Sequence, residues 1–62
     1  MVRFKHKIND IVETKSLGSF NALVKVKILE CYIGQYEPYY RVQEIKNKEL
    51  IYYRNESEIK VL

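Results

Sequence analysis

The sequence contains few of the residues on which small secreted domains and most catalytic sites depend. Its 62 residues include one cysteine, one histidine, one proline, two glycines and no tryptophan. With Cys31 as the single cysteine, no internal disulfide can form, whereas secreted domains of this size usually need several. We therefore expect a reducing, cytoplasmic setting.

Catalytic and metal-binding patterns are absent as well. His6 and Cys31 are the only residues of their kinds, so the sequence contains neither a Cys/His nucleophile pair nor a set of zinc ligands. Glu56 and Glu58 fit a solvated turn better than an acid-base pair, which would also need a cavity. A chain of this length buries only about 60% of its unfolded surface, so its apolar side chains are needed for the core. We expect no enzyme activity, no cofactor and no metal.

Charge and hydropathy limit the partners. No apolar stretch approaches the roughly 20 residues of a membrane span, and no export signal is visible, so we expect no membrane partner. Lysine and arginine outnumber aspartate and glutamate by 11 to 8, which gives a net charge of +3. This excess is small for a dedicated DNA-coating protein, but it keeps nucleic acid open as a partner. Lysine, isoleucine, asparagine and tyrosine have AT-rich codons and are abundant here, which suggests a bacterial or phage source.

Hydrophobic alternation predicts an all-β fold within a single domain, residues 1–62. The clearest element runs from Ala22 to Leu29, where alternate residues are apolar. Gly34 and Pro38 place a long hairpin tip at 30–38, and a polar segment at 55–58 fits a short 3-10 turn before the last strand. Strands are expected at 10–15, 22–29, 39–45, 50–54 and 60–62.

The alternation also assigns side chains to faces. In the fourth strand we place Ile51 and Tyr53 inward and Leu50, Tyr52 and Arg54 outward. The expected core consists of Val24, Val26, Ile28, Tyr40, Val42, Ile51 and Ile59.

Three segments resemble parts of Src-homology-three-like small barrels, including the KOW and translation-factor variants of bacteria and phages. Residues 7–12, Lys-Ile-Asn-Asp-Ile-Val, are similar to the "apolar, Gly-Asp, x, Val" opening of such barrels, with Asn9 where glycine is usual. Residues 38–42 resemble the third strand, and residues 55–62 resemble the closing 3-10 turn and final strand. The resemblance implies a five-stranded SH3-like barrel. The tryptophans and the acidic-aromatic loop of proline-peptide-binding members are absent, so no binding residues are carried over.

One candidate surface lies on the outward face of the central strands and would suit nucleic acid. Cations and flat aromatic rings on one curved sheet can hold a phosphate backbone and stack bases. The same pattern also fits side chains that only solvate the face and support cross-strand packing. The nucleic-acid-binding candidates are Lys25, Lys27, Tyr39, Arg41, Tyr52 and Arg54.

The other candidate surface is apolar and would suit a protein partner. Leu23 and Leu29 fall on the nominally wet side of the best strand, and Ile33 and Tyr36 fall in the hairpin tip. Alternatively, a long loop folds over these four side chains and covers them.

The sequence therefore favours a non-catalytic binding module, an accessory or inhibitor-type protein that docks on a larger protein. Nucleic-acid binding through the basic-aromatic face is the alternative. A structural subunit of an oligomer or phage particle would use the same apolar surface in a self-contact.

Overall fold

The computed structural model describes residues 3–17 and 22–60 of the chain. Five antiparallel strands form one sheet in the order β4-β3-β2-β1-β5. The strands are β1 (Ile11–Lys15), β2 (Leu23–Tyr32), β3 (Tyr39–Glu44), β4 (Ile51–Asn55) and β5 (Ile59–Lys60), and the 3-10 turn η1 (Glu56–Glu58) lies between β4 and β5. The prediction of a five-stranded all-β fold with a 3-10 turn before the last strand is confirmed.

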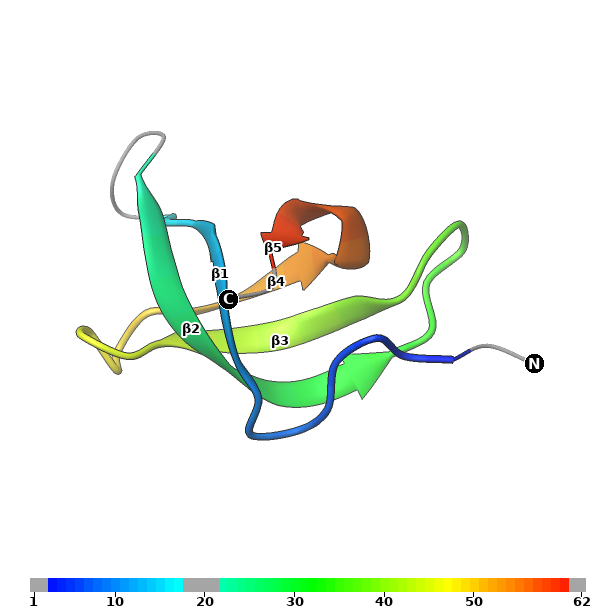
Figure 1. Cartoon of the computed structure of the whole chain (residues 1–62), viewed down its shortest axis with the longest axis horizontal. Coiled ribbons are helices and arrows are strands. Elements are labelled where there is room, and N and C mark those ends of the chain that lie inside the picture. The colour runs from blue at the N-terminus through cyan, green and yellow to red at the C-terminus, as the bar shows by residue number, and fades with distance from the viewer. Residues whose placement is uncertain (1–2, 18–21, 61–62) are drawn as a thin grey trace.

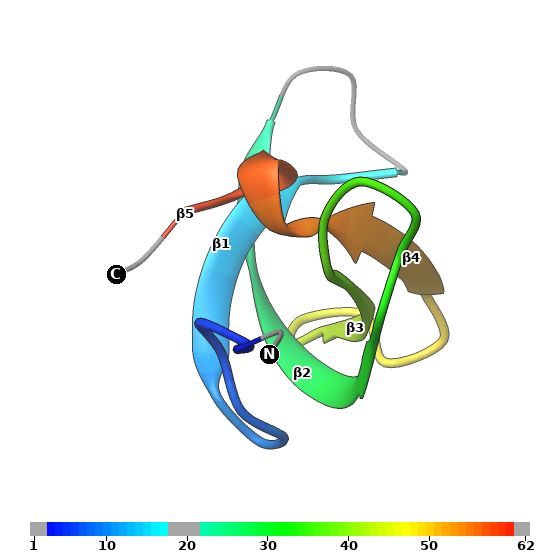
Figure 2. The ribbon, with the colours of Figure 1, turned by 90° about the vertical axis from the view of Figure 1, so that its right-hand side faces the viewer.

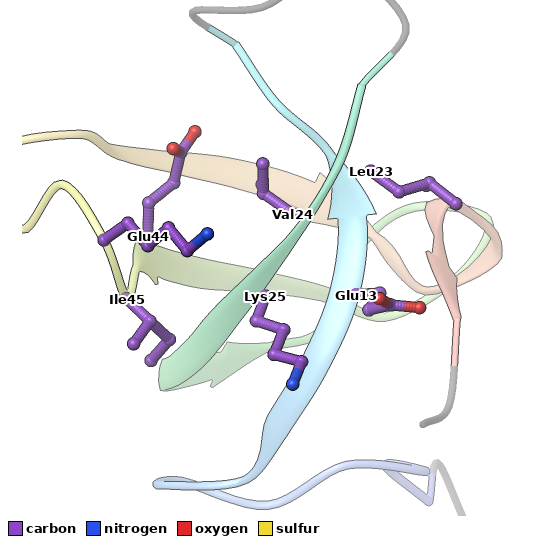
Figure 3. Close-up of a pocket in the computed structure, with 7 residues that line it drawn as sticks. Glu13, Leu23, Val24, Lys25, Glu44 and Ile45 are labelled. Carbon is purple, nitrogen blue, oxygen red and sulfur yellow. The ribbon is translucent and has the colours of Figure 1, made fainter.

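The sheet curls into a half-barrel because β2 is long and shared by both halves. Its first half pairs with β1 and its second half with β3 (Figure 1). Viewed from the end, the strands wrap around a common interior, and η1 carries the chain from β4 across to β5 (Figure 2). A groove opens where β3 leaves the side of β2, between 23–25 and 44–46 (Figure 3).

Turn geometry supports the predicted start of the fold. Asn9 has a φ of 77°, the left-handed conformation that asparagine tolerates better than most residues. Its N–H donates to the carbonyl of Ile28 at 2.7 Å, which holds the turn against β2. Asn9 therefore occupies a turn position whose positive φ would otherwise favour glycine.

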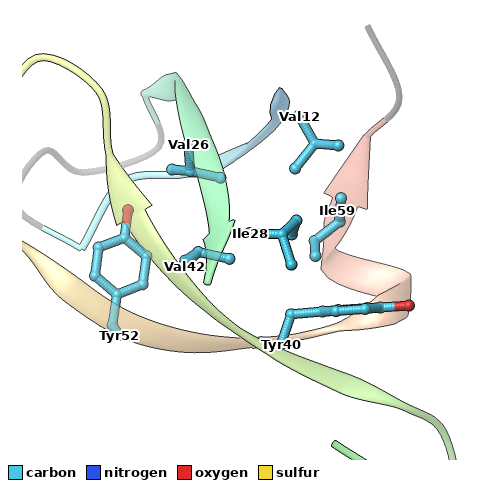
Figure 4. Close-up of a cluster of buried hydrophobic side chains, with 7 residues drawn as sticks. All are labelled: Val12, Val26, Ile28, Tyr40, Val42, Tyr52 and Ile59. Carbon is cyan, nitrogen blue, oxygen red and sulfur yellow. The ribbon is translucent and has the colours of Figure 1, made fainter. Parts of the chain in front are cut away.

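Seven apolar or aromatic side chains fill the interior (Figure 4). Five of the seven predicted core residues are among them, and Val24 packs against the cluster while partly exposed. The prediction for β4 is wrong, because Tyr52 is 7% exposed whereas Ile51 is 41% and Tyr53 57% exposed. The core comprises Val12, Val26, Ile28, Tyr40, Val42, Tyr52 and Ile59.

The inward face of β4 is determined by a buried carboxylate. Glu44 follows Val42 on the inner face of β3 and is 6% exposed. It accepts hydrogen bonds from Ser16 Oγ at 2.7 Å and from Tyr52 Oη at 2.6 Å. An unpartnered buried carboxylate is costly, so Glu44 favours the arrangement that turns the Tyr52 hydroxyl inward. Tyr53 must then point outward.

Candidate functional site

Three tyrosine side chains meet on the outer face of the sheet. Tyr32 ends β2 directly opposite Tyr39, the first residue of β3, and Tyr53 comes from β4. The rings of Tyr32 and Tyr39 stack with centroids 5.0 Å apart and an interplanar angle of 18°. Tyr53 meets both rings edge-on, at 5.9 and 6.0 Å. We call these three residues the tyrosine surface.

A β-bulge brings Tyr32 to this face. The register of β2 against β3 shifts between Ile28 and Glu30, so Leu29 is an extra residue in the ladder. Without that extra residue, the alternation that sends Ile28 inward would also send Glu30 and Tyr32 into the core. The bulge reverses this assignment, and Cys31 becomes the partly buried residue beside Tyr40.

Charges beside the tyrosine surface are paired within the protein. Glu30 accepts a hydrogen bond from Tyr32 Oη at 2.9 Å, and its other oxygen lies 3.6 Å from Arg41 Nη1. The hydrogen bond to Glu30 is the main cause of a raised pKa at Tyr32. Arg41 and Glu30 are both partly exposed, so their ion pair adds little stability. Its consequence is that the surface has little net charge.

The loop after Tyr32 packs close to the tyrosine surface. A Cβ atom placed on Gly34 would lie 2.2 Å from the carbonyl oxygen of Glu37 and 3.2 Å from Tyr39 Cδ1, so this position needs glycine. The Glu37 carboxylate accepts hydrogen bonds from the N–H and hydroxyl of Ser57, at 2.7 and 3.1 Å, which ties the loop to η1. Gly34 therefore allows the loop to approach Tyr39 closely.

The four protein-binding candidates do not form one patch. Leu23 begins β2, whereas Ile33 follows its last residue, so the two lie at opposite ends of a ten-residue strand. Leu29 occupies the bulge and is half-buried. Ile33 and Tyr36 are 68% and 91% exposed in the loop beside the tyrosine surface. The structure thus leaves Ile33 and Tyr36 uncovered in the loop that joins Tyr32 to Tyr39, away from Leu23.

The nucleic-acid candidates on β4 are not on the outer face. Tyr52 belongs to the core, where desolvation first and the Glu44 hydrogen bond second raise its pKa to about 12. Arg54 shares its side of the strand and places its guanidinium carbon 4.5 Å from the centre of the Tyr52 ring. The same guanidinium donates to the backbone oxygens of Tyr53 and Lys15, at 3.0 and 3.2 Å. The outward assignment of Tyr52 and Arg54 is therefore wrong.

The remaining four nucleic-acid candidates lie on the outer face, but mostly beside acidic groups or other tyrosines. Lys25 stands opposite Glu13 in the β1–β2 ladder, and Arg41 is paired with Glu30. Lys27 lies opposite Gln43, and Tyr39 stacks on Tyr32. Four of the six candidates thus remain on the outer face, without Tyr52 and Arg54.

Other polar groups in the interior serve the fold. Tyr40 Oη donates to Glu56 at 2.6 Å, and burial followed by this hydrogen bond raises the Tyr40 pKa. The same bond is the largest cause of a lowered pKa at Glu56. Burial, with a smaller effect of Asp10, raises the pKa of the Cys31 thiol, the opposite of the change that activates a thiolate. The Tyr40–Glu56 hydrogen bond thus joins β3 to η1.

The described part of the chain contains neither a cluster of metal ligands nor a helix that could span a membrane. Residues 3–17 and 22–60 hold no group of three or more histidine, cysteine, aspartate or glutamate side chains that could bind a metal ion. Within the same ranges, no helix has the length and apolar character needed to cross a membrane. Comparison with protein-family models, with curated proteins and with solved structures finds no match to this chain.

Proposed function

We propose that the protein is a non-catalytic, SH3-like binding module, an accessory or inhibitor-type protein that docks on a larger protein through the tyrosine surface. The observation that carries this proposal is the contact of Tyr32, Tyr39 and Tyr53 on an open sheet face, with Tyr53 57% exposed. Tyrosine is enriched at the energetic centres of protein interfaces, because its ring is apolar and its hydroxyl can bond to a partner.

Residues near the tyrosine surface also support a role in protein binding. Ile51 lies two residues before Tyr53 on the same side of β4 and is also exposed. Ile33 and Tyr36 are exposed in the loop that joins Tyr32 to Tyr39. Stacking of Tyr32 on Tyr39 fixes both rings before a partner arrives, which lowers the entropy lost on binding. The result is an aromatic centre whose ring positions are already fixed.

Charge distribution favours a protein partner over nucleic acid. Arg41 is paired with Glu30, and Arg54 of β4 is engaged with Tyr52 and two carbonyl groups. A phosphate backbone would have to compete with these internal partners of the two arginines. Nucleic-acid binding would then depend mainly on Lys25, Lys27 and Tyr39, a small footprint for a strand of phosphates.

A reducing, cytoplasmic setting fits this function, and we include it in the proposal. The thiol of Cys31 is free, partly buried and has a raised pKa. Its Sγ lies 3.6 Å from the backbone oxygen of His6, as expected for a side chain that packs rather than reacts.

The test is an affinity pull-down from an extract of the source cell, with and without nuclease. We expect protein partners that persist after nuclease treatment and are lost with Tyr53→Ala. Ile8→Ala is the matched control, because Ile8 is also 57% exposed but lies in the turn before β1. Loss of all bound material on nuclease treatment, or equal retention by the Tyr53 and Ile8 variants, would overturn the proposal.

A further inference from the structure

The backbone of Leu23 faces the groove between β2 and the end of β3. In the β1–β2 ladder, Ile28 N–H donates to Asp10 O at 2.9 Å, and Ser16 N–H donates to Ala22 O at 2.8 Å. These bonds show that the even-numbered residues in this part of β2 direct their backbone groups toward β1. Alternate residues of an antiparallel strand point to opposite sides, so Leu23, Lys25 and Lys27 direct theirs toward β3.

β3 reaches only two of these three residues. Lys27 is opposite Gln43 in the β2–β3 ladder, and Lys25 O accepts a hydrogen bond from Ile45 N–H at 3.1 Å. The chain then turns away, with Leu50 N–H donating to Asn47 O at 3.0 Å. In the described part of the chain, no strand pairs with Leu23 on this side. Within the described residues, the N–H and C=O of Leu23 are therefore unpaired by any strand on the side of β2 that faces β3, and they form a short open edge there.

The groove at this edge has a volume of about 280 Å³. Leu23, Val24 and Ile45 supply its apolar walls, and Lys25 and Lys46 also line it (Figure 3). The volume is close to the lower end of the range for ligand sites, roughly 300 Å³, which limits an occupant to a short segment. An open strand edge beside apolar walls suits a strand of another chain.

The charges at the groove favour an acidic occupant. Four charged side chains line the groove: Glu13, Lys25, Glu44 and Lys46. Glu44 is 6% exposed and Glu13 is half-buried, whereas Lys25 and Lys46 are exposed. The charged side chains that a ligand can reach most easily are therefore the two lysines.

We propose that this groove is a second recognition site, which accepts an extended peptide segment bearing an acidic side chain. The segment pairs its backbone with Leu23, places its flanking side chains on Val24 and Ile45, and directs its carboxylate to Lys25 and Lys46. This site is separate from the tyrosine surface and does not depend on the function proposed for it.

The test is a titration of the ¹⁵N-labelled protein, followed by amide chemical shifts, with the peptide acetyl-Val-Glu-Val-amide. We expect saturable shifts centred on the amides of Leu23 and Ile45. A peptide N-methylated at its glutamate should not produce them, because it lacks the central N–H. The analogue with lysine in place of glutamate should bind up to about fivefold more weakly, as the loss of an exposed ion pair predicts.

Charge exchange provides the decisive variant. Lys46→Glu should reverse the preference, so that the lysine peptide binds more tightly than the glutamate peptide. Tyr53→Ala should leave peptide binding unchanged, which separates failure of this proposal from failure of the tyrosine surface. The proposal is overturned if the three peptides cause the same shifts, if the shifts centre on the tyrosine surface, or if the Leu23 amide does not move at about 10 mM peptide, a weak-affinity limit.

Discussion

Replacing Tyr52 with phenylalanine removes one oxygen atom from the interior and leaves the ring in place. The hydroxyl is one of two donors that hold the buried Glu44 carboxylate, at 2.6 Å. Hydrogen bonds to charged groups contribute about 1.5 to 3 kcal/mol, and Glu44 would lose this bond while keeping the one from Ser16 Oγ. We therefore expect Tyr52→Phe to lower the free energy of unfolding by about 1.5 to 3 kcal/mol.

Chemical denaturation at neutral pH measures this loss, and Tyr53→Phe is the matched control. Tyr53 is the next residue and lies on the outer face, so its variant should change stability by less than about 0.5 kcal/mol. The phenol of Tyr52 also has a pKa raised to about 12, so its contribution is complete below the ordinary value of 10 and lost as the pH rises toward 12. Equal losses in the two variants, or a larger loss at Tyr53, would refute the assignment of Tyr52 to the core.

Three further outcomes follow from the structure. Val26→Ala, at a fully buried position, should cost about 1 to 4 kcal/mol in thermal or chemical unfolding, and an unchanged melting temperature would contradict the core described above. Cys31→Ser should fold and bind as the parent does, since burial raises the pKa of the thiol, and loss of binding in a folded variant would reopen the question of catalysis. The lowered pKa of Glu56 implies a stabilising contribution that is present above the ordinary pKa of 4.5 and is lost as the pH falls through the pKa of the folded state. Because the Tyr40 hydroxyl is the main cause of this lowered pKa, Tyr40→Phe should reduce the loss of stability in an acid titration. An unchanged pH profile would argue against the Tyr40–Glu56 bond.

The parts of the fold with regular local patterns could be predicted from the sequence. Strict alternation from Val24 to Ile28 identified the central strand and most of its inward face. Asparagine tolerates a positive φ better than most residues, and Asn9 adopts one. The polar segment before Ile59 indicated the 3-10 turn that connects the last two strands. In each case the local residue pattern is enough to indicate the conformation.

The tyrosine surface could not be predicted, because two of its members depend on distant contacts. Ile51, Tyr52 and Tyr53 are all suited to a core, so their alternation does not decide which faces inward. The available signal was Glu44, whose inward position on the neighbouring strand requires a hydroxyl donor. The outward position of Tyr32 depends on the bulge, which simple alternation does not predict. The residue that could have indicated the bulge is Glu30, because unbroken alternation would bury its carboxylate.

The most direct test of docking through the tyrosine surface is the affinity of the partner recovered by pull-down, measured against salt for two variants. Tyr53→Ala should weaken binding by about 1 to 3 kcal/mol with little dependence on salt, as expected for an aromatic anchor. The double variant Lys25→Glu with Lys27→Glu should bind nearly as the parent does. A steep fall of affinity with salt, together with loss of binding in the folded double variant and none in Tyr53→Ala, would contradict the proposal and favour nucleic acid.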